Sequence, residues 1–204
     1  FGAYRDAIRL IAAEGMARRL ILLNDSIWFP LAPGDDLIAR IEGLGAPFAG
    51  ASHEEKPGRA HRAHLQSFFY LLDAPLLGHP AFAAFWRGYP LSSVRRKVLA
   101  RGEKGFSAAM AAAGFAAAAP ASRRGGPGAL ERFSPPDLRL ALEYAAAPDP
   151  ARAAERAGLL RLPDAALAGP ARAHIAAATA GSGYAERFPL ASARAFGLHY
   201  LKKR

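Results

Sequence analysis

The 204-residue chain is long enough to form one well-buried domain, or one domain with a small appendage. Of its residues, 51% are apolar and 22% are charged, which favours a globular protein over a disordered or fibrous one. It has no cysteine, which excludes disulfides, thiolate metal sites and a cysteine nucleophile, and which suits a reducing, cytoplasmic location. No apolar run approaches the ~20 residues that span a bilayer.

The net charge of +10 makes a nucleic-acid binder the first hypothesis to weigh. The excess is spread along the chain, because residues 1–120 carry 14 basic and 10 acidic side chains and residues 121–204 carry 13 and 7. Arginine outnumbers lysine by 22 to 5, as the codon bias of a high-GC genome would produce. We therefore expect no nucleic-acid partner and interpret the charge mostly as solvated surface. The same charge would suit a nucleotide diphosphate or a peripheral contact with the inner membrane.

The first predicted element is an amphipathic helix over residues 4–19, because apolar residues recur there at helical spacing. Leu20–Leu23 is a short continuous apolar run, typical of a strand buried on both faces, and it stops at Asn24-Asp25-Ser26. A second helix follows, with Asp35 as its cap and four apolar residues on one face: Leu37, Ile38, Ile41 and Leu44.

The middle of the chain predicts a loop, a strand and three helices. The polar residues 53–64 indicate a surface loop, and Leu65–Leu72 indicates a second buried strand. The helices expected after it begin at Pro80, run from a cap at Ser92 or Ser93 to about Arg101, and cover about Glu103–Ala113. This order of elements is typical of the α/β class.

The composition changes after residue 119. Residues 120–128 (PASRRGGPG) indicate a Gly/Pro/Arg linker. We therefore expect an α/β domain over residues 1–119 and a mainly helical region over residues 129–204. Short helices are predicted in that region at about residues 137–147, 150–158 and 164–179.

Asn24-Asp25-Ser26 lies where an α/β sheet places its functional groups, just beyond the carboxyl end of a strand. The Asp25 carboxylate could hold a divalent cation against a diphosphate, and Asn24 and Ser26 could hydrogen-bond ribose or sugar hydroxyls. The alternative is an Asx turn that closes the strand, with Asp25 bonded to local amides. The residues alone do not favour either interpretation.

Three further side chains are candidates for chemistry. Glu103 could be a general base that deprotonates an acceptor hydroxyl, or simply an acidic residue that suits the first turn of a helix. Gln66 and Ser67 are polar residues within the predicted strand Leu65–Leu72. They could face a pocket, or they could satisfy each other and the backbone inside the core.

Aromatic and histidine residues provide weaker signals. Trp28 could form the wall of a sugar site, whereas Trp86 is better explained as core packing. Zinc binding in the loop with His53, His61 and His64 is disfavoured, because its spacing lacks a helical His-Glu-x-x-His pattern. Walker, dinucleotide-binding, nucleophile-elbow and kinase motifs are absent from the sequence.

Four stretches occur in a familiar order over about residues 2–116. They are Gly2-Ala3-Tyr4 before a helix, Leu22-Leu23-Asn24-Asp25-Ser26, His64-Leu65-Gln66-Ser67-Phe68-Phe69 with the helix Ala81–Trp86, and Glu103 followed by Ser107 and Gly114-Phe115. In these stretches the chain resembles the rhamnan synthesis protein F family. Members of that family are glycosyltransferase-like proteins of bacterial polysaccharide and lipopolysaccharide biosynthesis.

The resemblance implies a GT-A-like fold, which is a mixed sheet flanked by helices that binds a nucleotide-sugar. Asn24-Asp25-Ser26 then takes the place of an Asp-x-Asp metal motif, and Asp25 would bind Mg²⁺ or Mn²⁺. Because the triplet has a single acid, metal dependence stays open. Glu103 would be the catalytic base, and Trp28, Gln66 and Ser67 would shape the substrate pocket. The chain begins after most of the expected N-terminal β-α-β portion, so we expect that portion upstream or a shortened homologue.

The leading hypothesis is a glycosyltransferase that moves a sugar, such as rhamnose or another deoxysugar, from a nucleotide-sugar to a growing surface polysaccharide. Its acceptor would be a glycan or a lipid-linked glycan. The alternative is a non-catalytic glycan-binding or scaffold module of the same assembly machinery, in the cytoplasm or peripheral to the inner membrane.

Overall fold

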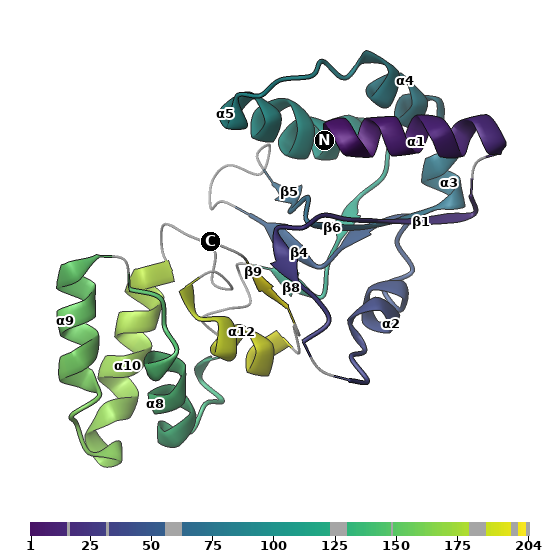
Figure 1. Ribbon diagram of the computed structural model, residues 1–204. Helices are drawn as coiled ribbons and strands as arrows, with labels where there is room; N and C mark the ends of the chain where they lie inside the picture. Colours follow the sequence, from purple (N-terminus) through teal and green to yellow (C-terminus); the bar gives the residue numbers. More distant parts are fainter. Residues whose placement is uncertain are drawn as a thin grey trace. The chain divides into compact units, whose positions relative to one another are not determined.

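The computed structural model describes residues 1–15, 17–31, 33–55, 63–122, 130–147, 149–179, 187–196 and 200–202. The chain divides into two compact units (Figure 1). The first unit contains Phe1–Asp25 and Asp36–Ser122, and the second contains Ser26–Asp35 and Arg123–Arg204. The described residues are mixed α/β, with helices and a mixed sheet, as predicted. Within them, no helix is long and apolar enough to cross a membrane.

The first unit contains a four-stranded sheet in the order β1-β6-β3-β7. β6 pairs antiparallel with both β1 and β3, and β7 pairs parallel with β3. The sheet is therefore mixed. Its strands are β1 (Arg19–Leu23), β6 (Phe69–Asp73), β3 (Phe48–Gly50) and β7 (Ala117–Ala118). A smaller sheet has the order β5-β4-β8, with β5 at His64–Leu65, β4 at Ser52–Glu54 and β8 at Ala121–Ser122.

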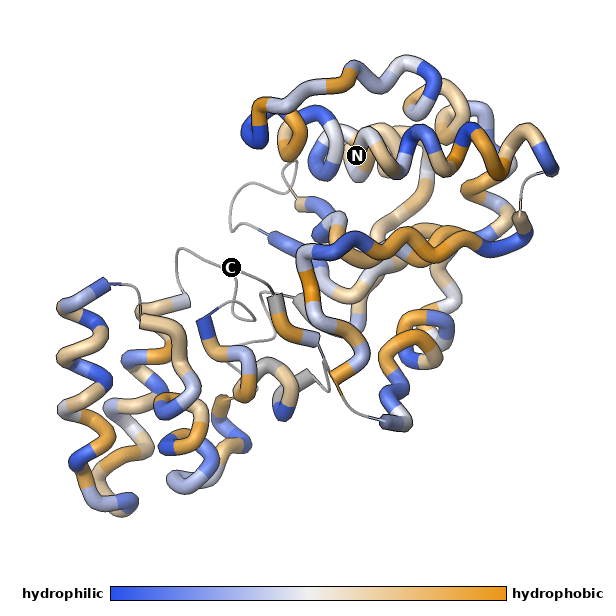
Figure 2. Tube along the Cα trace, in the orientation of Figure 1, coloured by the Kyte–Doolittle hydropathy of each residue, from blue (hydrophilic) through white to orange (hydrophobic). Residues whose placement is uncertain are grey.

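β1 is an edge strand, and the prediction that it is buried on both faces was wrong. Its burial alternates: Leu22 is 5% exposed, whereas Ile21 and Leu23 are 39% and 46% exposed. Figure 2 shows that the strand is nonetheless apolar beyond its first residue, Arg19. The continuous apolar run therefore predicted the strand correctly, but it did not show that the side chains on one face are partly exposed to solvent.

The predicted strand Leu65–Leu72 is interrupted. Residues 67 and 68 form a turn, so β5 ends at Leu65 and β6 begins at Phe69. Gln66 and Ser67 therefore connect two strands instead of lying inside one. The prediction of a single strand was wrong because the apolar residues on either side conceal the turn.

A helical layer covers one face of the four-stranded sheet, with α1, α4 and α5 on that side and α2 on the other (Figure 1). The core beneath it is rich in aromatic rings. Phe106 packs against Phe82, Trp86 and Tyr70, with ring centroids 5.3 to 6.1 Å apart. Trp86 is 2% exposed and so belongs to the core, as expected. The helices are α1 (Gly2–Glu14), α2 (Leu37–Glu42), α3 (Ala74–Leu77), α4 (Pro80–Gly88), α5 (Arg95–Val98) and α6 (Gly105–Ala112).

Glu103 does not begin a helix, contrary to the prediction. A π-helix, η2 (Leu99–Lys104), joins α5 directly to α6, so Glu103 lies inside one helical run. The predicted caps also shift. The N-cap of α2 is Asp36 instead of Asp35, and the N-cap of α5 is Val94, whose amide donates to Ser92 Oγ at 3.1 Å.

The second unit is mainly helical among its described residues, and the three helices predicted there are confirmed to within a few residues. Its core contains buried leucines and alanines with Phe188. Two arginine side chains link distant segments of this unit by hydrogen bonds to backbone carbonyls. Arg139 donates to Leu160 and Leu162. Arg172 donates to Phe133. The elements are α8 (Pro135–Glu143), α9 (Pro150–Leu159), α10 (Asp164–Thr179), α12 (Pro189–Phe196) and the antiparallel pair β2 (Ile27–Trp28) and β9 (Leu201–Lys202). Most of the predicted linker 120–128 lies outside the described residues.

Candidate functional site

Asn24 and Asp25 follow the last residue of β1 at the edge of the four-stranded sheet. The Asn24 amide donates to the Phe68 carbonyl at 3.3 Å, which extends the β1–β6 pairing by one bond. Asn24 is half-buried and Asp25 is exposed in the turn that follows. The half-buried side-chain amide of Asn24 therefore lies beside a solvent-accessible carboxylate, a pair that can bind hydroxyl groups or a cation.

The turn between β5 and β6 lies next to this strand end. The Gln66 backbone amide donates to the Ser52 carbonyl at 3.0 Å. The Ser67 amide donates to Glu103 Oε2 at 2.7 Å, and the Ser67 carbonyl accepts from the Tyr4 hydroxyl at 2.9 Å. Both polar backbone groups of Ser67 are thus held by side chains from helical segments. The predicted strand residues Gln66 and Ser67 instead form an anchored turn.

Glu103 is largely buried, with 13% of its side chain exposed. Its Oε1 lies 3.1 Å from His64 Nε2, and its Oε2 accepts from the Ser67 backbone amide. Burial raises the pKa of Glu103, whereas hydrogen bonds from His64 and Ser67 lower it, and the net pKa lies below its ordinary value of 4.5. Glu103 is therefore ionised at neutral pH and holds the β5–β6 turn against η2.

η2 determines where the Glu103 side chain points. Single turns of π-helix inside α-helices are rare and occur frequently at functional sites, because the wider turn reorients side chains. Gly102, also in η2, packs closely against Phe1, because a Cβ atom at this position would lie 2.6 Å from the Phe1 ring. The local sequence thus allows close packing on one side of η2, while Glu103 reaches the β5–β6 turn.

Tyr4 connects the two halves of the cluster. Burial raises the pKa of the Tyr4 hydroxyl; a side-chain hydrogen bond with Asn24 lowers it and the charge of Asp25 raises it. Because the same hydroxyl donates to the Ser67 carbonyl, Tyr4 joins the β1 end to the β5–β6 turn. The polar cluster, defined as Tyr4, Asn24, Asp25, His64, Ser67 and Glu103, lies entirely in the first unit.

The structure brings together four of the predicted site residues, Asn24, Asp25, Ser67 and Glu103, through these contacts, and Gln66 lies next to Ser67 in the turn. Ser26 and Trp28 belong to the second unit, where Trp28 is 60% exposed and pairs with Leu201. Sequence reasoning did not select Tyr4 or His64 as site residues. Both residues lie in stretches that carry the family resemblance, Gly2-Ala3-Tyr4 and His64-Leu65, although neither stretch indicates a partner.

Metal binding has one candidate ligand in the cluster. In the part of the chain that the structure describes, no three histidine or acidic side chains lie close enough to hold a metal. Asp25 alone could contribute one carboxylate, and Mg²⁺ is commonly held by one or two carboxylates together with substrate phosphates. The histidines for which zinc binding was disfavoured have carboxylate partners instead. His53 Nδ1 lies 3.2 Å from Glu55, and His64 lies 3.1 Å from Glu103. His61 is outside the described residues.

The chain is similar to one curated protein, the uncharacterized protein y4gN of Sinorhizobium fredii (strain NBRC 101917 / NGR234). The two are 32% identical over 100 residues, which cover 48% of this chain and 26% of the relative. The match therefore spans about a quarter of that protein's length. No family profile matches the chain, and no solved structure is significantly similar to it.

Proposed function

We propose that the chain belongs to a glycosyltransferase with a GT-A-like fold, related to the rhamnan synthesis protein F family. It would transfer a sugar, such as rhamnose or another deoxysugar, from a nucleotide-sugar to a growing bacterial surface polysaccharide. The observation that carries the proposal is the polar cluster, in which a strand-end Asn24-Asp25 pair is tied through Tyr4 and Ser67 to Glu103 on η2. A buried acid in a π-helix beside a strand end is an arrangement suited to a site.

Asn24 and Asp25 are the groups proposed to bind the donor. Asp25 is exposed and Asn24 is half-buried, so both can reach a ligand beyond the sheet edge. The side-chain amide of Asn24 would hydrogen-bond a ribose or sugar hydroxyl. If Mg²⁺ or Mn²⁺ is used, Asp25 would supply one ligand and the donor diphosphate would supply others, which would neutralise the charge on the leaving nucleotide.

Glu103 has two possible roles in the proposed reaction. As the general base, it would accept the proton of the acceptor hydroxyl while that oxygen attacks the anomeric carbon and the nucleoside diphosphate leaves. As a positioning residue, it would hold the Ser67 turn in place. The lowered pKa and the two existing hydrogen bonds favour positioning, because both make the carboxylate a weaker base.

A transfer assay tests the proposal. Release of nucleoside diphosphate from a nucleotide-sugar, with a bacterial polysaccharide acceptor, is measured for the wild type, Asp25→Ala and Glu103→Gln. Asp25→Ala should lower the rate, and Glu103→Gln should lower it by about 10²–10⁴-fold if Glu103 is the base, but much less if it positions the turn. Full activity in both variants would sink the site assignment.

A second candidate is a non-catalytic glycan-binding module, and the exposure of Trp28 favours it. An exposed indole provides an apolar face on which a sugar ring can stack, and 60% of Trp28 is exposed on β2. This candidate predicts that the chain binds purified polysaccharide without any nucleotide-sugar and that Trp28→Ala abolishes binding. Binding that depends on Asp25 and requires the donor would favour the transferase instead.

A further inference from the structure

The helical layer of the first unit contains a long stretch without acidic residues. From Ala74 to Gly102 the sequence has five basic residues and no aspartate or glutamate. Four of the five lie on α5 and η2, namely Arg95, Arg96, Lys97 and Arg101, and all four are exposed. We call residues 91–101 the basic segment. Its charge is local, unlike the evenly distributed charge of the chain as a whole.

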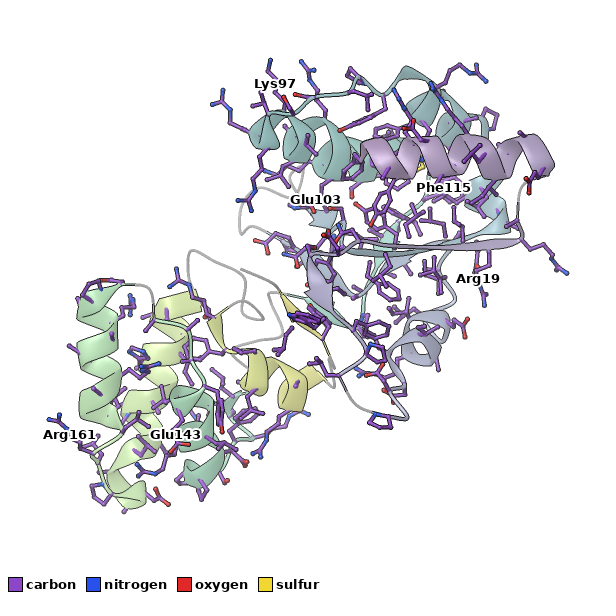
Figure 3. All side chains as sticks on the ribbon, viewed as in Figure 1. Arg19, Lys97, Glu103, Phe115, Glu143 and Arg161 are labelled. Carbon is purple, nitrogen blue, oxygen red and sulfur yellow. The ribbon has the colours of Figure 1, made fainter. Side chains whose placement is uncertain are left out.

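Three of the four cations of the basic segment have no internal partner among the described residues. Arg95, Arg96 and Lys97 form neither an ion pair nor a side-chain hydrogen bond there. By contrast, Arg139 and Arg172 hold backbone carbonyls in the second unit. Figure 3 shows Lys97 on the outer side of the helical layer, away from the sheet. The segment therefore presents a local excess of positive charge to solvent.

Exposed aliphatic side chains accompany these cations. Leu91, Val94 and Leu99 are 55%, 48% and 37% exposed. A surface that binds single-stranded nucleic acid would combine its cations with exposed aromatic rings for stacking. Cations together with exposed aliphatic groups instead match the interface of a bilayer, where basic residues meet anionic headgroups and apolar side chains enter the acyl boundary.

An apolar hollow adjoins the basic segment. It has a volume of about 480 Å³, and Tyr89, Leu91 and Val98 are among the residues that line it. Tyr89 is 5% exposed, and its hydroxyl has no hydrogen-bond partner in the described part of the chain. Arg101 lies close enough to lower the pKa of Tyr89, although burial raises that pKa by more. The hollow thus offers mostly apolar walls next to the cations of the basic segment.

We propose that the basic segment docks the chain on an anionic phospholipid surface. Arg95, Arg96, Lys97 and Arg101 would contact the headgroups, and Leu91, Val94 and Leu99 would enter the acyl boundary. The hollow beside Leu91 would receive apolar groups at that boundary. The proposal concerns a surface formed by α5 and η2, and it does not depend on sugar transfer by the polar cluster.

Vesicle flotation with the 204-residue chain tests the proposal without any sugar substrate. The probes are phosphatidylcholine vesicles with and without 30 mol% phosphatidylglycerol, a composition chosen for the assay. The chain should bind the anionic vesicles at low salt and bind neutral vesicles weakly. Replacing Arg95, Arg96 and Lys97 by alanine should lower the partition coefficient roughly 100-fold, because each cation near an anionic surface contributes about fivefold.

The matched control replaces three exposed arginines elsewhere, Arg18, Arg132 and Arg161, by alanine. It has the same net charge as the basic-segment variant, and it should bind anionic vesicles within about threefold of the wild type. Equal loss in both variants would show that net charge alone drives binding, and it would overturn the proposal. Absence of wild-type binding, or tighter binding to duplex DNA that is lost in the same variant, would overturn it too.

The aliphatic contribution is tested by Leu91→Ser combined with Val94→Ser. This variant should bind several-fold more weakly at low and at high salt, because insertion of apolar groups is not screened by ions. Circular dichroism checks that the variant is folded. Unchanged vesicle binding by a folded double variant would contradict the insertion of the segment.

Discussion

Glu103 accepts a hydrogen bond from the Ser67 backbone amide at 2.7 Å, and its Oε1 lies 3.1 Å from His64 Nε2. Replacing Glu103 by alanine should therefore lower the free energy of unfolding by about 1–3 kcal/mol, the typical cost of a buried polar group left unpaired. Urea denaturation measures the change. Lys104→Ala is the matched control, because Lys104 is exposed next to Glu103, and it should change stability by at most about 0.5 kcal/mol.

The lowered pKa of Glu103 predicts a pH dependence of stability. Because the pKa is lower in the folded state than the ordinary 4.5, ionised Glu103 contributes stability above that value. The contribution is lost as pH falls through the folded-state pKa. The difference in unfolding free energy between wild type and Glu103→Gln should therefore shrink as pH falls from about 6 to about 3. A difference that stays constant over that range would mean that the carboxylate is not stabilised by His64 and Ser67.

At the level of single residues, the sequence identified candidate polar side chains but not the hydrogen bonds that join them. Asn24, Asp25, Ser67 and Glu103 were selected for residue type and position, and the structure joins them within one unit. The link through Tyr4 was not foreseen, because a hydrogen bond between residues 63 positions apart leaves no local pattern. The burial of Glu103 was hidden for the same reason, since its partners lie in a distant turn.

At the scale of single elements, β1 allows a direct test of its edge position. Leu22 is 5% exposed and packs in the core, so Leu22→Ala should lower the unfolding free energy by about 2–5 kcal/mol. Ile21→Ala should cost at most about 1 kcal/mol, because Ile21 faces the other side and is 39% exposed. Thermal or urea unfolding distinguishes the two. Equal losses would indicate that both faces of β1 are covered.

Gly50 tests the close pairing of β3 with β6. A Cβ atom at Gly50 would lie 2.7 Å from the Phe69 carbonyl oxygen, and this backbone atom cannot easily move aside. Gly50→Ala should therefore destabilise the fold by about 1–3 kcal/mol. Gly88→Ala is the control, because Gly88 is helical with no atom near its Cβ position, and it should be neutral or stabilise by up to about 1 kcal/mol.

Elements with regular periodicity were predicted best. The helices expected at about 150–158 and 164–179 match α9 and α10 closely, because proline, an acidic residue or both mark their starts. The run Leu65–Leu72 was misjudged as one strand, since its turn contains no glycine or proline. The predicted helix start at Glu103 failed because η2 continues α5 without any break that a sequence pattern would mark.

At the scale of the whole molecule, the two units have separate hydrophobic cores with no residue in common. Glu103 supports the first unit, and Arg172 supports the second by donating to the carbonyls of Leu130 and Phe133. The losses in unfolding free energy caused by Glu103→Ala and Arg172→Ala should therefore add to within about 0.5 kcal/mol in the double variant. A larger deviation, measured by urea denaturation, would show coupling between the two residues.

The most direct test of the proposed donor site is calorimetric titration of the chain with UDP-, GDP- and dTDP-sugars in the presence of Mg²⁺. At least one nucleotide-sugar should bind, and Asn24→Ala and Asp25→Ala should each weaken that binding about tenfold or more, because each removes a group proposed to contact the donor. Glu143→Ala, which removes an exposed carboxylate in the second unit, should leave the affinity unchanged. Binding of no donor, or binding that both variants leave intact, would contradict a donor site at the end of β1.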